Sequence, residues 1–352
     1  MTFIHFQDVS KSFGQTRVVE NLDLAVEKGE FLSLLGPSGS GKTTILMMLA
    51  GFENASSGTI LMDGERIEDL PPHKRGIGVV FQNYALFPHM TIAENVAFPL
   101  QMRGMSKAEI ATRVKTGLDR VRLGHLGDRR PDQLSGGQQQ RVALTRALVF
   151  EPKVVLMDEP LGALDKQLRE EMQLEIRELH RRLGLTVVFV THDQGEALTM
   201  SNRIAIFDKG KISQVGTATE VYDHPQNAFV AQFIGETNLL GATVDASDTE
   251  GTRLALEGGT SLKAAPGPTF RPGTAVMVSV RPERLHLHTD ARPDAIETRV
   301  DDVVYQGDHL RLHLSRGPLR LIARAERRLG APAVGGPAHV VIDPADIAVF
   351  PA

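Results

Sequence analysis

Short, continuous apolar runs alternate with helical patterns over roughly the first 235 residues of the chain. Residues 31–35, 154–157 and 186–190 are such runs, rich in Val, Leu and Phe. In residues 167–183, apolar side chains recur at 168, 172, 176, 179 and 183, the spacing of one helix face. Apolar runs set between helices are typical of parallel strands that are buried on both faces. The first part of the chain is therefore predicted to be an α/β domain.

The pattern changes after about residue 236, where Gly and Pro cluster and short alternating segments take over. Leu310, Leu312 and Leu314 alternate with polar neighbours, and after a turn the alternation resumes at Leu319 and Leu321. Several short strands joined by regular turns are typical of a small sandwich or barrel. We therefore expect two domains, residues 1–235 and residues 236–352, the second of them all-β.

Composition supports two folded domains and excludes several classes of protein. The 352 residues are 41% hydrophobic and 23% charged, near the average of globular proteins, so we expect neither disorder nor a collagen-like repeat. A formal net charge of -4 lacks the basic excess typical of nucleic-acid binders. The absence of cysteine excludes disulfides, thiolate metal sites and cysteine nucleophiles.

No segment of the sequence has the character of a membrane span, which needs about 18 uninterrupted apolar residues. Residues 1–8 lack the basic and apolar stretches of a secretory signal. We therefore expect a protein of a reducing compartment that reaches a membrane only through another subunit.

A glycine-rich segment at residues 36–43, Gly-Pro-Ser-Gly-Ser-Gly-Lys-Thr, matches the phosphate-loop pattern between an apolar strand and a helix predicted at 44–50. Its glycines allow backbone N–H groups to surround phosphate oxygens, and the helix N-terminus adds a favourable field. Lys42 is expected to reach the β- and γ-phosphates of a nucleotide, and Thr43 to ligate Mg²⁺. The alternative is a Gly- and Ser-rich connector that matches the pattern by chance.

A pair of carboxylates, Asp158 and Glu159, follows the apolar run at 154–157. A carboxylate at a strand end beside a phosphate loop can hold Mg²⁺, a role that we assign to Asp158. Glu159 can polarise an attacking water as a general base. An acidic loop after a buried strand is the structural alternative, and the presence of the phosphate loop favours the catalytic interpretation.

Residues 134–138, Leu-Ser-Gly-Gly-Gln, followed by a helix predicted at 139–149, resemble the signature of ATP-binding cassette (ABC) ATPases. The order of motifs is also that of this family: the phosphate loop, Gln82, the signature, the carboxylate pair, Asp165 and His192. The resemblance covers about residues 1–235. It implies an ABC cassette of the α/β P-loop NTPase class, with a RecA-like core and a helical subdomain at about residues 86–152.

The resemblance also implies roles for single residues. In this family two cassettes pair head to tail, and the signature of one closes over the γ-phosphate held by the other. His192 would hydrogen-bond the γ-phosphate, Gln82 would contact Mg²⁺ or the attacking water, and Asp165 would read the opposite site. Phe13 matches the aromatic residue that stacks on adenine. The implied catalytic residues are Glu159, His192, Gln82 and Lys42, and the implied metal ligands are Thr43, Gln82 and Asp158. The implied nucleotide-binding residues are Phe13, Gly36, Pro37, Ser38, Gly39, Ser40, Gly41, Lys42, Thr43, Thr44, Ser135, Gly136, Gly137, Gln138 and Asp165.

Two features favour a transporter among the functions that such cassettes serve. The chain lacks the sustained heptads of coiled-coil repair proteins, and it has one cassette where translation factors usually have two. Apolar side chains between Tyr84 and Pro88 suit a groove for a short helix of a membrane subunit, although the alternative is that they pack inside the cassette. We expect a homodimer of ATPase subunits, two integral membrane permeases docked near residues 84–88, and a solute-binding protein that acts indirectly.

The second domain resembles the transport-associated OB-like (TOBE) domain of importers, an OB-like barrel with a regulatory role. The resemblance rests on residues 278–283, Val-Ser-Val-Arg-Pro-Glu, and 340–347, Val-Val-Ile-Asp-Pro-Ala-Asp-Ile. Segments 85–91, 196–201 and 228–236 are most similar to those of spermidine/putrescine importer ATPases.

Together these resemblances imply an ATPase that powers uptake of a small solute, with ATP and Mg²⁺ as cofactors. Polyamine is the first expectation for the solute, and ferric iron, sugar or another organic solute are the alternatives. The expected location is the cytoplasmic face of the inner membrane, where the permeases hold the subunit. A soluble ATP-dependent switch on nucleic acid or ribosomes is a distant alternative, and no nucleic-acid partner is expected.

Overall fold

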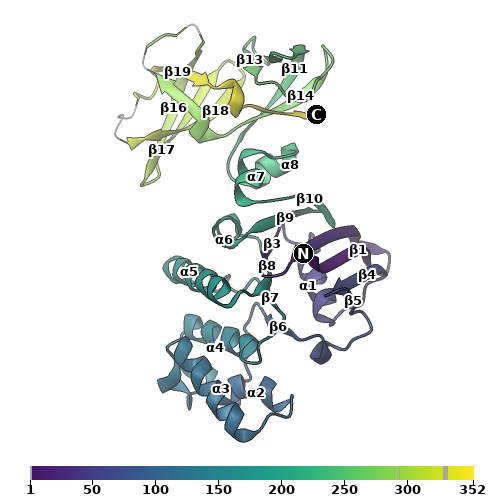
Figure 1. The fold of residues 1–352 in the computed structure, drawn as a ribbon. Helices are drawn as coiled ribbons and strands as arrows, with labels where there is room; N and C mark the ends of the chain where they lie inside the picture. Colours follow the sequence, from purple (N-terminus) through teal and green to yellow (C-terminus); the bar gives the residue numbers. More distant parts are fainter. Residues whose placement is uncertain (1, 289, 293, 328–331) are drawn as a thin grey trace. The chain divides into compact units, whose positions relative to one another are not determined.

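The computed structural model describes residues 2–288, 290–292, 294–327 and 332–352 (Figure 1). The chain divides into two compact units, residues 1–218 and 219–352. The domain boundary predicted near residue 235 lies after this division and stays a prediction. Within the described residues, no helix combines the length and apolar character that a membrane crossing requires.

A six-stranded sheet forms the middle of the first unit, with strand order β10-β9-β3-β8-β7-β6. Neighbouring strands from β9 to β6 run parallel, and β10 pairs antiparallel with β9. Every residue of β3, β7 and β8 is buried, as the three apolar runs predicted. The strands are β3 (Phe31–Leu35), β6 (Ile77–Val80), β7 (Val154–Asp158), β8 (Thr186–Thr191), β9 (Arg203–Asp208) and β10 (Lys211–Gly216).

A second sheet of the first unit has four strands in the order β2-β1-β4-β5 and is antiparallel. Helix α1 (Lys42–Ala50) buries Ile45, Leu46 and Leu49 in a core that residues of both sheets share. Because α1 follows β3 closely, this core fixes the position of the helix N-terminus. The strands are β1 (Thr2–Phe13), β2 (Thr16–Glu27), β4 (Ser57–Met62) and β5 (Glu65–Arg66).

Three helices, α2 (Ile92–Gln101), α3 (Lys107–Arg120) and α4 (Gly136–Leu148), pack around a core of their own. Helix α5 (Lys166–Leu183) instead buries Met172, Ile176 and Leu179 in a core with residues of β7 and β8. These three belong to the predicted apolar stripe, whereas its last member, Leu183, is 41% exposed. The remaining helix is α6 (Gln194–Met200), and short 3-10 turns lie at η1 (Pro72–Lys74), η2 (Gly124–Leu126) and η3 (Pro131–Gln133).

The second unit holds two five-stranded antiparallel sheets, ordered β13-β12-β11-β14-β20 and β15-β19-β16-β17-β18. Buried side chains of both sheets, among them the alternating leucines of β17 and β18, form one core. An all-β region of this kind confirms the predicted fold class. Two short helices precede the sheets in the chain, α7 (Ala218–Asp223) and α8 (Ala228–Phe233). The strands are β11 (Asn238–Asp248), β12 (Gly251–Leu256), β13 (Ser261–Ala264), β14 (Ala275–Val280), β15 (Leu285–His288), β16 (Ile296–Tyr305), β17 (His309–Arg316), β18 (Leu319–Glu326), β19 (Pro337–Ile342) and β20 (Ala348–Pro351), and 3-10 turns lie at η4 (Pro282–Arg284) and η6 (Pro344–Asp346).

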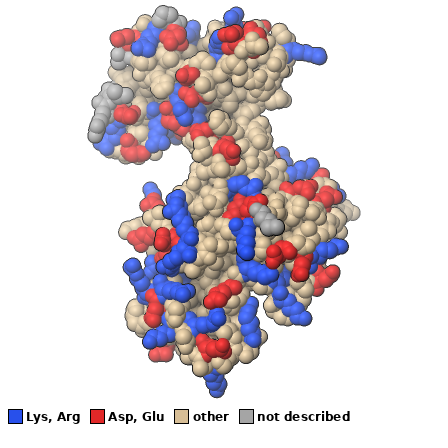
Figure 2. Space-filling view, viewed as in Figure 1, with Lys and Arg blue, Asp and Glu red and all other residues tan. Residues whose placement is uncertain are grey.

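Charged side chains of both signs are interspersed over the face drawn in Figure 2. This distribution agrees with the small formal net charge of -4.

Candidate active site

The glycine-rich segment at residues 36–41 is a tight loop between β3 and α1. A Cβ on Gly36 would lie 2.5 Å from the carbonyl oxygen of Phe207, and one on Gly41 would lie 2.6 Å from that of Val18. Gly41 also has a φ of 96°, a backbone conformation that favours glycine. The loop therefore needs glycine at both positions. Helix α1 begins at Lys42, two residues before the predicted start. A difference of two residues is usual at helix ends.

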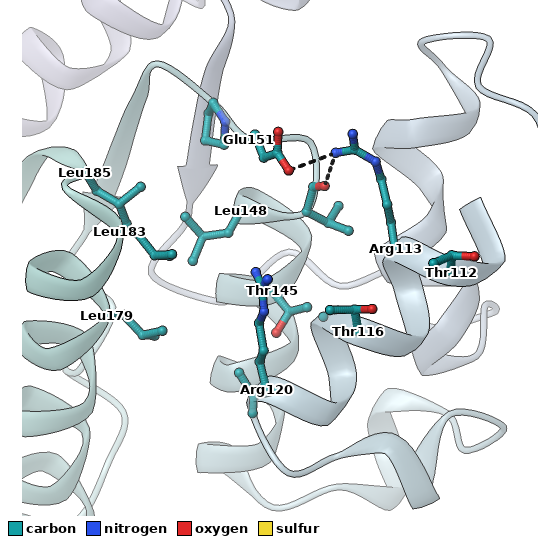
Figure 3. Close-up of a pocket in the computed structure, with 14 residues that line it drawn as sticks. Thr112, Arg113, Thr116, Arg120, Thr145, Leu148, Glu151, Leu179, Leu183 and Leu185 are labelled. Atoms are coloured by element: carbon teal, nitrogen blue, oxygen red, sulfur yellow. Dashed lines mark hydrogen bonds and ion pairs between the residues drawn. The ribbon is translucent and has the colours of Figure 1, made fainter. Parts of the chain in front are cut away.

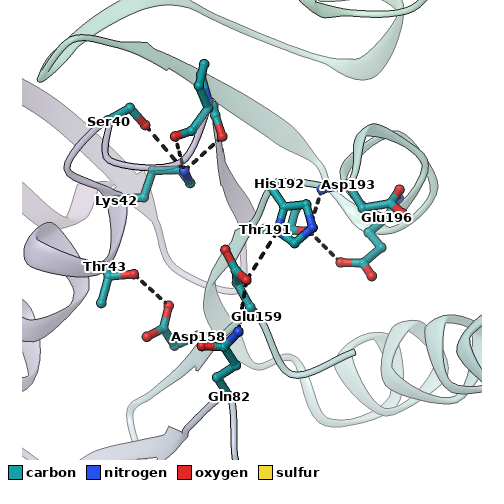
Figure 4. A network of polar contacts seen from close by, with 12 residues as sticks. Ser40, Lys42, Thr43, Gln82, Asp158, Glu159, Thr191, His192, Asp193 and Glu196 are labelled. Carbon is teal, nitrogen blue, oxygen red and sulfur yellow. Dashed lines mark hydrogen bonds and ion pairs between the residues drawn. The ribbon is translucent and has the colours of Figure 1, made fainter. Parts of the chain in front are cut away.

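Lys42 folds its side chain back into the loop, as Figure 4 shows. Its Nζ donates hydrogen bonds to the carbonyl oxygens of Gly36 and Pro37, both at 2.8 Å, and to Ser40 Oγ at 3.3 Å. The side chain is buried, and burial lowers the pKa of Lys42, while the nearby carboxylates of Glu159 and Asp158 raise it. The loop and its lysine thus form a compact, electropositive cradle of the kind that binds phosphate.

Thr43 and Asp158 meet across the gap between α1 and the end of β7. Thr43 Oγ1 donates a hydrogen bond to Asp158 Oδ1 at 3.0 Å. Burial raises the pKa of Asp158; the bond from Thr43 and the charge of Lys42 lower it, and Glu159 raises it further. A hydroxyl and one carboxylate suit Mg²⁺, which takes few protein ligands and completes its shell with water and substrate phosphates. The described residues contain no cluster of three or more His, Cys, Asp or Glu side chains for an all-protein metal site.

Two predicted catalytic residues, Gln82 and His192, converge on one carboxylate oxygen of a third, Glu159. Gln82 Nε2 donates a hydrogen bond to Glu159 Oε2 at 3.3 Å, and His192 Nδ1 lies 3.2 Å from the same oxygen. Glu159 adopts a left-handed backbone with a φ of 43°, and its N–H donates to the carbonyl oxygen of Val190. This unusual conformation turns the carboxylate toward Gln82 and His192 (Figure 4).

His192 is surrounded by a further cluster of polar side chains. The sequence analysis did not identify this cluster. Thr191 Oγ1 donates a hydrogen bond of 2.6 Å to Glu196, a side chain only 2% exposed, and burial raises the pKa of Glu196. Arg169 forms an ion pair with Asp193 at 3.2 Å. Asp193 and Glu196 are spaced like an N-cap and its third helical residue, a signal in the sequence that suggests a fixed helix start.

The signature begins α4, three residues before the predicted helix start. Ser135 Oγ accepts a hydrogen bond from the N–H of Gln138, and the Gln138 side chain accepts one from the N–H of Ser135. Gly137 is buried against Leu168, whose Cδ2 would lie 2.8 Å from an added Cβ. Asp165 caps α5 by accepting a hydrogen bond from the N–H of Leu168. Within the described part of the chain, no hydrogen bond or ion pair joins Ser135, Gln138 or Asp165 directly to Lys42 or Glu159.

Comparisons with known proteins show the family of the chain. A model of the ABC transporter family matches residues 19–162, and a TOBE domain model matches residues 278–350. A spermidine/putrescine import ATP-binding protein of Pseudomonas aeruginosa is 47% identical over 309 residues, which cover 87% of this chain and 85% of the relative. The chain belongs to the ATP-binding proteins of ABC transporters.

One further relative of this ABC protein carries the same description, and two solved structures are similar to part of the chain. The spermidine/putrescine import ATP-binding protein of Rubrobacter xylanophilus is 49% identical, covering 86% of this chain and 81% of its own. An ATP-binding cassette solved as a dimer with ADP and Pi aligns with a TM-score of 0.55 and 33% identity, over 61% of this chain and 98% of its own. For cbiO1 from Clostridium perfringens, part of an ABC transporter complex, the TM-score is 0.58 and the identity 29%, over 62% and 90% of the two chains.

Phe13 is 47% exposed at the end of β1 of the ABC cassette. Lys11 Nζ lies 4.6 Å from the centre of its ring. The ring is therefore a surface feature and not part of the core. None of the hydrogen bonds or ion pairs of the described residues joins it to the phosphate loop, so its place at the adenine stays a prediction.

The segment from Tyr84 to Pro88 divides between the core of the cassette and its surface. Tyr84 is buried in the core, whereas Ala85 and Phe87 line an apolar groove of about 560 Å³ together with Phe52, Phe81 and Phe98. Arg146, which the sequence analysis missed, donates to the carbonyl oxygens of both Tyr84 and Ala85, at 2.8 and 2.7 Å. These two residues have positive φ values of 61° and 46°, so the guanidinium holds an unusual turn in place.

A second groove of the cassette, about 540 Å³, lies between α3, α4 and α5. Figure 3 shows Leu179, Leu183 and Leu185 on one side of it and Arg113 and Arg120 on the other. None of the predicted nucleotide-binding or catalytic residues lines it.

Proposed function

We propose that this chain is the ATP-hydrolysing subunit of an ABC importer for polyamines. The observation that carries the hydrolytic part is the convergence of Gln82 and His192 on one oxygen of Glu159, next to the phosphate loop. These three residues come from distant parts of the sequence, and a water between them and a bound γ-phosphate would meet a base, a donor and a positioning amide.

The phosphate loop and Lys42 bind the β- and γ-phosphates. The three acceptors that Lys42 contacts in the loop already hold its ammonium group where phosphate oxygens would arrive. Thr43, Asp158 and Gln82 would hold Mg²⁺, which when bound neutralises phosphate charge. Glu159 polarises the attacking water, and His192 donates to the γ-phosphate. The described contacts of Glu159 keep both its partners within reach of a single site.

A second copy of the chain completes each site. The exposed N-terminus of α4, with Ser135 and Gly136, offers N–H groups to an anion but is not joined to the phosphate loop of its own chain. The solved relative with ADP and Pi is described as dimeric. In a head-to-tail homodimer, residues 135–138 close over the γ-phosphate of the partner, Phe13 stacks on adenine, and Asp165 contacts the opposite site.

Two integral membrane permeases hold the subunit at the cytoplasmic face of the membrane. The apolar groove lined by Ala85 and Phe87 has the character of a site for a short helix. Phe81, which directly precedes Gln82, also lines this groove, so a helix seated there would contact the segment that positions the attacking water. A solute-binding protein outside the membrane delivers the solute to the permeases.

Polyamine as the solute rests on the relatives. Spermidine/putrescine import proteins of several bacteria are 47–51% identical to this chain over most of its length. Ferric iron, sugars and other organic solutes remain the alternatives from the sequence resemblance, because the cassette itself does not touch the solute. No described feature of the structure favours any of these alternatives.

The substitution Glu159→Gln tests both parts of the proposal. It should leave ATP binding by the purified chain unchanged and slow hydrolysis by about 100-fold or more, the scale expected for loss of a general base. Cells that depend on this variant should also lose uptake of labelled spermidine. The exposed Glu170 on α5 offers a matched control, and Glu170→Gln should hydrolyse ATP and support uptake normally.

Two outcomes would count against the proposal separately. Normal hydrolysis by Glu159→Gln would show that Glu159 is not the base. Loss of hydrolysis with unchanged spermidine uptake would leave the ATPase role standing and remove polyamine as the solute.

A further inference from the structure

Arg169 on α5 contacts two segments that flank predicted functional residues. Its Nη2 donates to the carbonyl oxygen of Leu164 at 3.1 Å, and its Nη1 pairs with Asp193 Oδ2 at 3.2 Å. Its Nε also lies 3.9 Å from Glu196 Oε1. One planar guanidinium therefore joins the loop before α5 to the segment after β8, a set of simultaneous contacts that suits arginine and not lysine.

Each end of this bridge lies next to a predicted functional residue. Leu164 is buried and directly precedes Asp165, the residue expected to meet the opposite site. Asp193 directly follows His192, whose Nδ1 lies 3.2 Å from Glu159 Oε2. A displacement of the loop at one end of the guanidinium is thus transmitted to the histidine at the other end through two hydrogen-bonded contacts.

The segment around His192 is rigid enough to transmit such a displacement. Asp193 Oδ1 accepts a hydrogen bond from the N–H of Glu196 and caps α6, while its own N–H donates to Thr191 Oγ1 at 2.9 Å. Thr191 Oγ1 donates in turn to Glu196, which is almost fully buried. His192 is therefore held from both neighbouring residues, so that movement of Asp193 moves the histidine with it.

A cavity of about 40 Å³ lies between these groups and is lined by Glu159, Arg169, His192 and Glu196. It has room for about one water molecule. The space allows the bridge and the histidine to shift relative to Glu159 without repacking the surrounding core.

We propose that Arg169 is a positioning residue that couples the loop at Leu164 and Asp165 to His192 within one chain. When a second copy docks on Asp165, the guanidinium passes the displacement to Asp193 and brings His192 to its working position. Occupation of one site thereby promotes hydrolysis in the other. This inference rests on the proposed function, because it uses the roles proposed for Asp165 and His192.

The test compares Arg169→Gln with Asp193→Asn in the full-length chain. Asparagine keeps the cap of α6, since its side-chain oxygen still accepts from the Glu196 N–H, and removes the charge that pairs with Arg169. Glu175→Gln is the matched control, because Glu175 lies on the same helix and loses a 2.9 Å ion pair with Arg141 that is as well buried. The measurements are ATP affinity, kcat, the Hill coefficient of hydrolysis and the unfolding midpoint.

Both bridge variants should keep ATP affinity within about twofold and lose about tenfold in kcat, within the range of a coupling between two sites. Their Hill coefficient should fall toward that of independent sites, while Glu175→Gln stays like the wild type. The double variant should be no slower than the slower single variant, because both substitutions break the same Arg169–Asp193 contact. Additive losses, or bridge variants that behave like Glu175→Gln, would overturn the inference. Such a result overturns only the role of Arg169. The proposed function still stands if Glu159→Gln is inactive in the same assay.

Discussion

At the scale of single residues, His180 illustrates how the core of the cassette constrains protonation. Its Nε2 lies 3.0 Å from the carbonyl oxygen of Gly29, and its ring meets Phe31 edge-on with 5.4 Å between centroids. Burial lowers the pKa of His180 from its ordinary value of 6.5, although the backbone contacts with Gly29 and Leu185 raise it. The folded chain thus favours the neutral imidazole, whereas the unfolded chain takes up a proton near its ordinary pKa.

This difference predicts that acid weakens the fold through His180. Its contribution is fully present above 6.5, the unfolded pKa, and is lost as the pH falls from there through the lower folded pKa. The wild type should lose free energy of unfolding, relative to His180→Gln, by at most about 1.4 kcal/mol per pH unit. Urea unfolding of both proteins between about pH 7.5 and 5.5 measures the difference. The comparison cancels the opposite effect of Glu196, whose pKa is raised. Parallel profiles for the two proteins would contradict this prediction.

At the scale of elements, three helices of the cassette begin with the same arrangement of side chains. Helices α2, α3 and α4 each open on a capping box, formed by Thr91 and Glu94, by Ser106 and Glu109, and by Ser135 and Gln138. Each box satisfies two N–H groups of the first turn. The third box has glutamine where the other two have glutamate, and it lies within the signature, so a role of Ser135 in nucleotide binding can be separated from helix stability.

Substitution of two of these caps makes that separation. Ser135→Ala and Ser106→Ala should each destabilise the protein by about 1 kcal/mol, the usual effect of losing an N-cap. Only Ser135→Ala should also prevent ATP-driven dimerisation of a chain carrying Glu159→Gln, as measured by size-exclusion chromatography with light scattering. Equal dimerisation of the two variants would mean that the hydroxyl of Ser135 serves the helix alone.

Some elements and site residues of the cassette could be predicted from the sequence, and others could not. The three central strands were predictable because strands buried on both faces leave continuous apolar runs. Helix α4 starts earlier than the sequence analysis predicts, because its two glycines carry little helical signal, although Ser135 and Gln138 have the spacing of a capping box. Glu159 and His192 could be named from the order of motifs. Arg169 could not, because its partners come from elements that only the tertiary structure brings together.

At the scale of the whole molecule, the two units have separate cores. Among the described residues, the buried clusters of the first unit contain no residue of the second, and the cluster of the β sheets contains none of the first. Each unit therefore has the buried apolar surface that independent folding requires. The predicted nucleotide-binding residues of the chain lie in the first unit.

Calorimetry should therefore resolve two unfolding transitions that respond differently to nucleotide. A non-hydrolysable ATP analogue with Mg²⁺ at 100 times its Kd should stabilise the first unit by about 2.7 kcal/mol, which corresponds to roughly 5 to 10 °C. The transition of the β sheets should not move. Lys42→Ala serves as the control and should lose the shift. A common shift of both transitions would show that the units unfold as one.

The three hydrogen bonds of Lys42 determine when the glycine-rich loop becomes ordered. Glycine-rich segments have more backbone freedom to lose than any other kind of chain, and a loose loop would have to be ordered each time a nucleotide arrived. Here the ammonium group keeps the segment ordered by bonding two of its carbonyls and Ser40. Ordering takes place once, when the protein folds, so in the proposed cycle nucleotide would enter and leave a loop that is already preorganised.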